Sequence, residues 1–278
     1  MIAIKRLTLA LAIALLPGIA YACGEAPALE GVLSIPQCDP ASAVSGCVPG
    51  SRAAFDALEA LEMPSVFTIG VQTSPWRMYD PEGRILTVDE VAAMIRAQRP
   101  DSDRRVRLVG SWTAARPDGS SETLAHRLSV ALDGFPVDGS DGFLWLSPTG
   151  GMRTTRQAFS VWKTGPYRVA RGEDVLMALV PGASAQFEDQ FARDGIGEGV
   201  LQAGVGHDVF MLCPERTLAA FERAAGMGNA IGAYNAGLMH AENGDRSIAI
   251  TWLEKAKALG ETKATAALAT LREAAKPH

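Results

Sequence analysis

Two short apolar runs in the first half of the chain have the pattern of buried strands. Residues 66–71 and 105–110 are mostly apolar, and each run ends abruptly in polar and turn residues. Between them, Thr87 and Glu90 form a Thr-x-x-Glu capping box in front of an amphipathic segment, which predicts a helix. Strand, helix and strand at this spacing predict one βαβ unit with two adjacent parallel strands.

The same pattern continues towards residue 150. Apolar residues three and four positions apart predict a second helix over residues 121–133. Two further apolar runs, at residues 135–137 and 143–146, are expected to extend the unit. These elements predict an α/β fold, a mostly parallel sheet flanked by helices, in a domain over residues 51–214.

The other segments of this domain have weaker patterns. The expected elements are helices over residues 51–63 and 186–193, short strands at 159–162, 167–169 and 209–213, and a strand or helix at 175–180. Residues 195–206 contain five glycines, with Glu198 where an anion would sit in a phosphate-binding loop. This segment is therefore interpreted as a flexible connection.

Polar residues follow the two principal strands directly. Gln72 and Thr73 come after the first strand, and Ser111 and Trp112 come after the second. Ligands of parallel sheets bind at the carboxyl ends of the strands, so these four residues mark the candidate site.

This region resembles the α/β domain of caspase-like cysteine peptidases, in which one strand ends in His-Gly and a later strand ends in the nucleophilic Cys. Gln72 and Thr73 stand where the His-Gly pair would be, and Ser111 stands where the Cys would be. The Gln72 amide cannot accept a proton from Ser111. The resemblance therefore implies a degenerate site.

The last part of the chain is helical in pattern and contains an internal repeat. Residues 220–224 recur as residues 252–256, a shift of 32 positions, and Gly228 recurs as Gly260. The repeat resembles the Sel1-like form of the tetratricopeptide repeat, although Ala236 and Ala269 replace a Leu and a Gly of that pattern. The resemblance implies a helical hairpin array over residues 215–278.

Within this array, helices are expected over residues 229–242, 246–259 and 261–275. Fewer than two full repeats cannot bury a core alone, so the array is expected to pack on the α/β domain or on a partner. Such repeats bind proteins through helical faces, which the resemblance extends to this chain. The candidate partner-binding residues are Tyr234, Asn235, Met239, His240 and Trp252.

The amino terminus has the pattern of a secretory signal peptide over residues 1–22. Lys5 and Arg6 precede an apolar stretch, and Ala20-Tyr21-Ala22 is an A-x-A cleavage site. The apolar stretch is too short to span a bilayer comfortably. A periplasmic or secreted protein is expected. A lipid anchor at Cys23 is the alternative, although Ala20 occupies the position where lipoprotein signals usually carry Leu.

Export makes disulfides the expected state of the four cysteines. Three of them, Cys23, Cys38 and Cys47, lie in the segment 23–50, and the fourth is Cys213. A local Cys38–Cys47 bridge with Cys23–Cys213 is the first choice, and two other pairings stay open. The cysteines have neither CxxC spacing nor a His cluster, so no metal is expected.

Composition narrows the function further. The formal net charge is −5 and no basic cluster is visible, which argues against nucleic acid as a partner. His207 is the one plausible base for Ser111, but Ser111 lacks the Gly-x-Ser-x-Gly setting of hydrolases.

Two functions remain. The first is an exported bacterial envelope protein without catalytic residues or a cofactor. It would bind another envelope or secreted protein, for example to neutralise or regulate a secreted enzyme. The alternative is a secreted serine hydrolase that uses Ser111 and His207.

Overall fold

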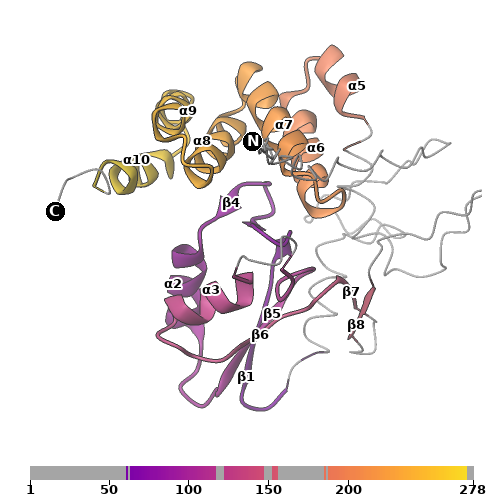
Figure 1. The fold of residues 1–278 in the computed structure, drawn as a ribbon, viewed down its shortest axis with the longest axis vertical. Coiled ribbons are helices and arrows are strands. Elements are labelled where there is room, and N and C mark those ends of the chain that lie inside the picture. Colours follow the sequence, from indigo (N-terminus) through magenta and orange to yellow (C-terminus); the bar gives the residue numbers. More distant parts are fainter. Residues whose placement is uncertain are drawn as a thin grey trace, which may run out of the picture.

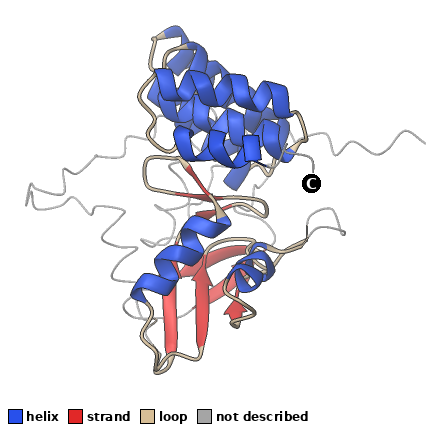
Figure 2. Cartoon of the chain, turned by 90° about the vertical axis from the view of Figure 1, so that its left-hand side faces the viewer, coloured by secondary structure: helices blue, strands red, loops and turns tan. Residues whose placement is uncertain are grey.

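The computed structural model describes residues 61, 63–116, 122–146, 152–155, 185 and 187–273. It is a mixed α/β structure: a small, mostly parallel sheet with two helices lies below a layer of carboxy-terminal helices (Figure 1). A view from the side shows the helical layer stacked over the ends of the strands (Figure 2). None of the helices in the described part of the chain is long and apolar enough to cross a membrane.

The main sheet contains the two predicted strands side by side. β1 (Val66–Gly70) pairs in parallel with β5 (Arg105–Val109), and β5 pairs in parallel with β6 (Val137–Asp138). The prediction of adjacent parallel strands is confirmed. Carboxyl ends of parallel strands meet at one edge of a sheet, and this edge faces the helical layer.

The two helices of this unit form where their capping residues stand. α2 (Val88–Gln98) begins with the predicted box: the Glu90 amide donates to Thr87 Oγ1 and the Thr87 amide donates to Glu90 Oε2, at 3.2 and 2.8 Å. α3 (Leu124–Ala131) is capped by Thr123, so it begins later than the predicted start at residue 121. Both helices pack on one face of the sheet.

The other described strands form two small antiparallel sheets. β2 (Gln72–Thr73), β3 (Met78–Tyr79) and β4 (Ile85–Leu86) form one of them. β7 (Phe143–Leu146) pairs with β8 (Met152–Thr155) to form the other. The apolar run at 143–146 thus does not extend the parallel sheet as expected, because it pairs antiparallel with β8, which follows it closely in the sequence.

In the described part of the chain, six helices make up the upper layer. They are α5 (Glu188–Arg193), α6 (Gly197–Val209), α7 (Pro214–Gly226), α8 (Ala230–Glu242), α9 (Arg246–Ala258) and α10 (Ala264–Glu273). The predicted helices over 186–193, 229–242 and 246–259 are confirmed, and α10 is shorter at its start than the predicted 261–275. The expected domain boundary at residue 215 falls in the first turn of α7, a helix that packs on α6.

The glycine-rich segment was wrongly interpreted. Residues 197–209 form α6, neither a flexible connection nor the start of a strand at 209–213. A Cβ on Gly204 would lie 2.6 Å from the Phe221 ring, and one on Gly199 would lie 2.4 Å from the Phe191 ring. The glycines therefore serve close helix packing, whose gain outweighs their low helix propensity.

We expect Gly204→Ala to lower the free energy of unfolding by about 1–3 kcal/mol, because the added methyl group overpacks against Phe221. Gly226→Ala is the matched control: it also lies in a helix, but its Cβ would meet nothing within 4 Å. There the better helix propensity of Ala should be neutral or stabilising, by up to about 1 kcal/mol. Urea unfolding followed by circular dichroism measures both. Equal stability of the two variants would show that Phe221 moves freely.

Several predicted features lie outside the described residues. They are the signal peptide 1–22, the cysteine segment 23–50, the helix over 51–63 apart from residues 61 and 63, and the elements at 159–162, 167–169 and 175–180.

Candidate functional site

The carboxyl edge of the main sheet brings the predicted strand-end residues together. The Thr73 hydroxyl donates to the Ser111 carbonyl at 2.7 Å, and the Val71 amide donates to the Val109 carbonyl at 3.1 Å. Gly110 permits this approach, because a Cβ there would lie 2.5 Å from Thr73 Oγ1. The expectation that both strand ends emerge at one edge is confirmed.

The hydroxyl of Ser111 is part of the backbone scaffold. It accepts a hydrogen bond from the Leu144 amide at 3.0 Å, and the Trp112 amide donates to the Gly142 carbonyl at 2.8 Å. Trp112 has a positive φ of 65°, and its ring meets Phe143 edge-on at 5.1 Å. These contacts tie the end of β5 to the start of β7 and give Ser111 a structural role.

His207 lies in α6 and serves a different set of groups. Its Nε2 is 2.9 Å from Glu188 Oε2, and its buried Nδ1 has no hydrogen-bond partner among the residues that the structure describes. The His207 hydrogen bond lowers the pKa of Glu188; burial opposes the shift, and Arg223, which donates to Glu188 Oε1 at 3.1 Å, adds to it. Neither ring nitrogen of His207 is therefore hydrogen-bonded to Ser111. The catalytic dyad that a serine hydrolase would need from these two residues is not formed in the structure.

The candidate partner-binding residues face inwards. Tyr234, Asn235, Met239 and His240 are buried, and only Trp252 is partly exposed. Asn235 Oδ1 accepts from the Ile85 amide at 2.9 Å, and Asn235 Nδ2 donates to the Gly83 carbonyl at 2.8 Å. The prediction that the helices pack on the α/β domain is confirmed. The expectation that these four residues contact a partner is wrong, because the chain itself buries them. The β3–β4 hairpin covers Asn235, Tyr234 packs with α9 and α10, and His240 Nε2 lies 2.8 Å from Glu222 Oε1 in α7.

A charged cluster that the sequence analysis missed joins the two layers. It consists of the buried residues Arg77, Tyr79 and Asp208 and the exposed Glu242. Arg77 donates to Asp208 Oδ1 at 2.9 Å and to Glu242 Oε2 at 2.7 Å, and the Tyr79 hydroxyl donates to Asp208 Oδ2 at 2.7 Å. Burial alone would lower the pKa of Arg77, but Asp208 and Glu242 raise it above its ordinary value. Burial and Asp208 raise the pKa of Tyr79, so the phenol stays protonated and can donate.

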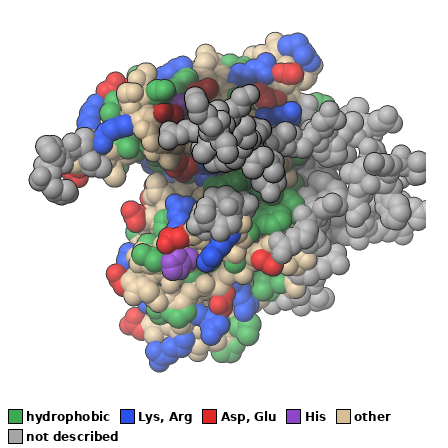
Figure 3. Space-filling view, viewed as in Figure 1, with side chains coloured by type: hydrophobic (Ala, Val, Ile, Leu, Met, Phe, Trp, Pro, Cys, Tyr) green, Lys and Arg blue, Asp and Glu red, His purple; other side chains and the backbone are tan. Residues whose placement is uncertain are grey.

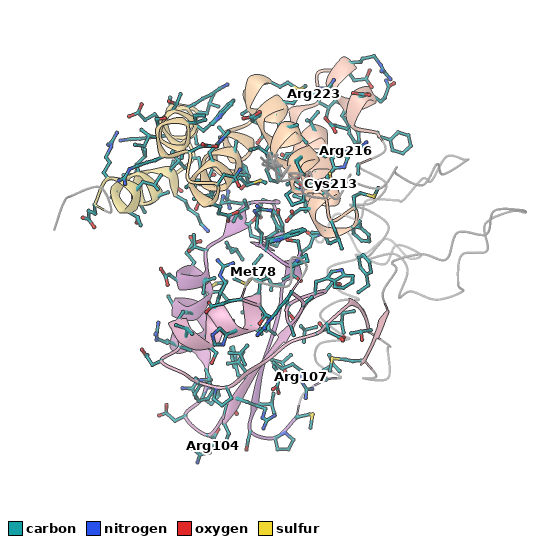
Figure 4. All side chains as sticks on the ribbon, viewed as in Figure 1. Met78, Arg104, Arg107, Cys213, Arg216 and Arg223 are labelled. Carbon is teal, nitrogen blue, oxygen red and sulfur yellow. The ribbon has the colours of Figure 1, made fainter. Side chains whose placement is uncertain are left out.

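Two successive residues of β3 beside this cluster, Met78 and Tyr79, belong to two different cores. Met78 packs with α2 and α3, whereas Tyr79 packs with α6, α7 and α8. In Figure 4 Met78 lies between the lower helices and the upper layer. The sequence offered one signal for this cluster, which is the charged Arg77 inside the otherwise apolar stretch Trp76–Tyr79. The partner acid is 131 positions away and could not be inferred from spacing.

The described residues contain no candidate metal site, and they include one of the four cysteines. No group of three or more His, Cys, Asp or Glu residues within the described ranges could hold a metal ion. Cys213 is fully buried and disulfide-bonded. The other three cysteines lie outside the described residues, so the pairing itself stays a prediction.

Comparison with known proteins gives one similarity. No curated protein and no solved structure matches the chain. Residues 49–154 match the model of one family, which is described as a domain of unknown function, DUF8616. The matched span contains the strands β1 to β7 and all but the last residue of β8, and none of the described helices from α5 onwards. The α/β part of the chain is therefore similar to that family, whose description names no activity.

Proposed function

We propose that this chain is an exported envelope protein that acts by binding another protein, with a strand-end site that is not catalytic. The observation that carries the proposal is the bonding at that edge. The Ser111 hydroxyl is held by the Leu144 amide, and the candidate base His207 is held by Glu188. A serine without an adjacent base is a poor nucleophile. The signal-peptide pattern of residues 1–22 supports the proposed location in the envelope or outside the cell.

The arrangement of the upper helices supports the Sel1-like resemblance. α8 begins at Ala230 and α6 at Gly197, 33 positions earlier; α9 begins at Arg246 and α7 at Pro214, 32 positions earlier. Two successive helical hairpins therefore have nearly the period of the sequence repeat, and the first of them begins in the glycine-rich segment. Stacked helix pairs of this kind present extended faces to other proteins.

The face open to a partner is the outer side of α9. Ile248 and Leu259 are 44% and 40% exposed, and they lie eleven positions apart, so both fall on one side of the helix. Trp252, partly exposed, lies between them, with the Lys255 ammonium 4.9 Å from its ring. Figure 3 shows cationic and anionic side chains interspersed over the described surface on one side of the molecule, which favours a protein rather than nucleic acid as the partner.

The test is capture of a partner by the immobilised mature chain from an envelope extract. The double variant Ile248→Ser and Leu259→Ser should lose the captured protein. Val130→Ser on α3 should retain it, because Val130 is more exposed, at 61%, but lies on the lower layer. Capture that is equal for both variants would overturn the assignment of the surface. An extract from which wild type captures nothing would count against protein binding altogether.

Ser111→Ala separates this proposal from the hydrolase alternative. We expect the variant to capture the partner as well as wild type does, and to show the same background ester hydrolysis, because Ser111 bonds only to backbone among the described residues. A fluorophosphonate probe, which labels activated serines, should leave the protein unlabelled. Labelling that disappears in Ser111→Ala would establish the hydrolase instead.

A further inference from the structure

All three asparagines of the chain belong to α8, the helix between α7 and α9 in the upper layer (Figure 1). Asn229 is its N-cap, Asn235 lies in its middle and Asn243 is its C-cap. An asparagine amide can react with the backbone nitrogen of the next residue. Its hydrogen bonds and the residue that follows it therefore decide how long it lasts.

Two of the three amides are held by hydrogen bonds. Asn229 Oδ1 accepts from the Gly232 amide at 2.7 Å, and its Nδ2 donates to Glu198 Oε2 at 3.2 Å. Asn235 is fully buried and bonds through both ends of its amide to the backbone of the β3–β4 hairpin. Each of these two asparagines is followed by an alanine, whose methyl group crowds the neighbouring backbone nitrogen.

Asn243 has neither of these protections. It is exposed, and its side chain makes no hydrogen bond within the described part of the chain. The next residue is Gly244, which has a positive φ of 85°. A Cβ on Gly244 would meet nothing within 4 Å, so open space surrounds this position. Asn243 therefore combines a free amide with an unhindered neighbour.

The fold requires the glycine but not the asparagine. The Gly244 amide donates to the Ala241 carbonyl at 3.1 Å and the Asp245 amide donates to the His240 carbonyl at 2.8 Å, which is the Schellman ending of a helix. That motif places the residue after the cap in the left-handed region, where glycine is favoured.

Two neighbouring helices end with the same positive φ but without an amide at the cap. The C-cap of α7 is Met227, followed by Gly228 at φ 88°, and the C-cap of α9 is Leu259, followed by Gly260 at φ 99°. Met and Leu at these caps show that the ending does not depend on a side-chain amide. The reactive pair in α8 is thus a property of Asn243 itself.

We propose that Asn243 is a deamidation site, with water as the co-reactant. The backbone nitrogen of Gly244 loses its proton and bonds to Cγ of Asn243, and the side-chain nitrogen leaves with that proton as ammonia. Water then opens the resulting succinimide at one of its two carbonyls. One opening gives aspartate and the other gives isoaspartate, and the chain stays intact in both.

The reaction needs the end of α8 to open briefly. In the folded turn Asn243 has a ψ of −6° and the Gly244 amide is bonded to Ala241, so the nitrogen must first leave that carbonyl. Helix ends open at a lower free-energy cost than buried contacts do. Asn235 would have to leave the β3–β4 hairpin, which requires separation of the two layers.

The product changes the turn between α8 and α9. Either acid places a negative charge at the carboxyl end of α8, beside Glu242 and Asp245, where the helix dipole disfavours it. Isoaspartate also lengthens the backbone by one methylene group, which displaces the Schellman hydrogen bonds. The modified chain should therefore have a lower melting temperature. This inference does not depend on the protein-binding function.

Peptide mapping by mass spectrometry tests the site, after the purified mature chain has been incubated in a mildly alkaline buffer. Asn243 should convert at least about tenfold faster than Asn229 or Asn235, because its turn opens more easily. Labelling by an isoaspartyl methyltransferase should appear in the same peptide. A synthetic peptide of residues 238–248 is the positive control. Equal conversion of the three asparagines, or an intact Asn243 in a buffer that converts the peptide, would overturn the proposal.

The matched variant is Asn243→Leu, which copies the Leu259 cap of α9. It should fold with the circular dichroism spectrum of wild type and keep its melting temperature through the incubation, whereas that of wild type falls. Asn243→Asp carries the charge without the longer backbone, so incubated wild type should contain a fraction that melts below this variant. An equal fall in Asn243→Leu would show that the destabilising change lies elsewhere in the chain.

Discussion

Arg77→Met will lower the free energy of unfolding by about 3–5 kcal/mol, because it leaves the Asp208 carboxylate buried without a cation. Asp208 is 0% exposed, and among the described residues its other side-chain partner is the neutral Tyr79 hydroxyl. Denaturation in guanidinium chloride, followed by circular dichroism, measures the loss. The matched control is Glu242→Gln. Glu242 is 41% exposed, so its pairing with Arg77 is largely compensated by water and should be worth about 0–1 kcal/mol.

A double variant separates charge burial from simple loss of packing. Arg77→Met combined with Asp208→Leu removes both charges, and apolar replacements of buried ion pairs are often neutral. Most of the stability lost in the single variant should therefore return. A single variant that loses less than about 1 kcal/mol would contradict this interpretation and indicate that water reaches Asp208.

Reduction of the Cys213 disulfide will lower the free energy of unfolding by about 2–5 kcal/mol, the usual contribution of a disulfide in a secreted domain. Cys213 is buried at the start of α7, where its carbonyl accepts from the Thr217 hydroxyl at 2.9 Å. Thermal unfolding with and without dithiothreitol measures the change. In Cys213→Ser the reductant should have a smaller effect, since one bridge is already missing.

Alkylation checks the redox state directly. Protein made in an oxidising compartment and then unfolded without reductant should contain no alkylated Cys213. Mass spectrometry of the disulfide-linked peptides would then show whether Cys38 is joined to Cys47, as the sequence predicts. An alkylated Cys213 under these conditions would contradict the disulfide.

Local signals explain what the sequence could predict. The capping box of Thr87 and Glu90 lies within four residues, and it defines the start of α2 wherever the helix packs. The apolar runs of β1 and β5 likewise identify strands from their own residues, although β1 is only partly buried. Their parallel pairing follows from the helix between them, and so does the meeting of Thr73 and Ser111 at one edge.

The predictions that failed concern residues whose contacts lie far away in the sequence. α6 is rich in glycine, and its stability comes from the rings of Phe191 and Phe221, which lie outside the helix. The repeat pattern showed which positions of α8 are small or apolar, but the β3–β4 hairpin that covers Asn235 is about 150 positions away. Arg77 and Asp208 could not be paired for the same reason. Sequence periodicity predicts a face, and only tertiary structure shows what lies against it.

The strand β3 has a consequence for how the chain folds. Met78 and Tyr79 are successive residues, yet each belongs to the interior of a different layer. Neither layer can lose its packing without withdrawing a side chain that the backbone ties to the other. The lower and upper halves should therefore behave as one cooperative unit that opens and closes together, rather than as two independently melting foldons. The family match ends at residue 154, but we expect no boundary between folding units there.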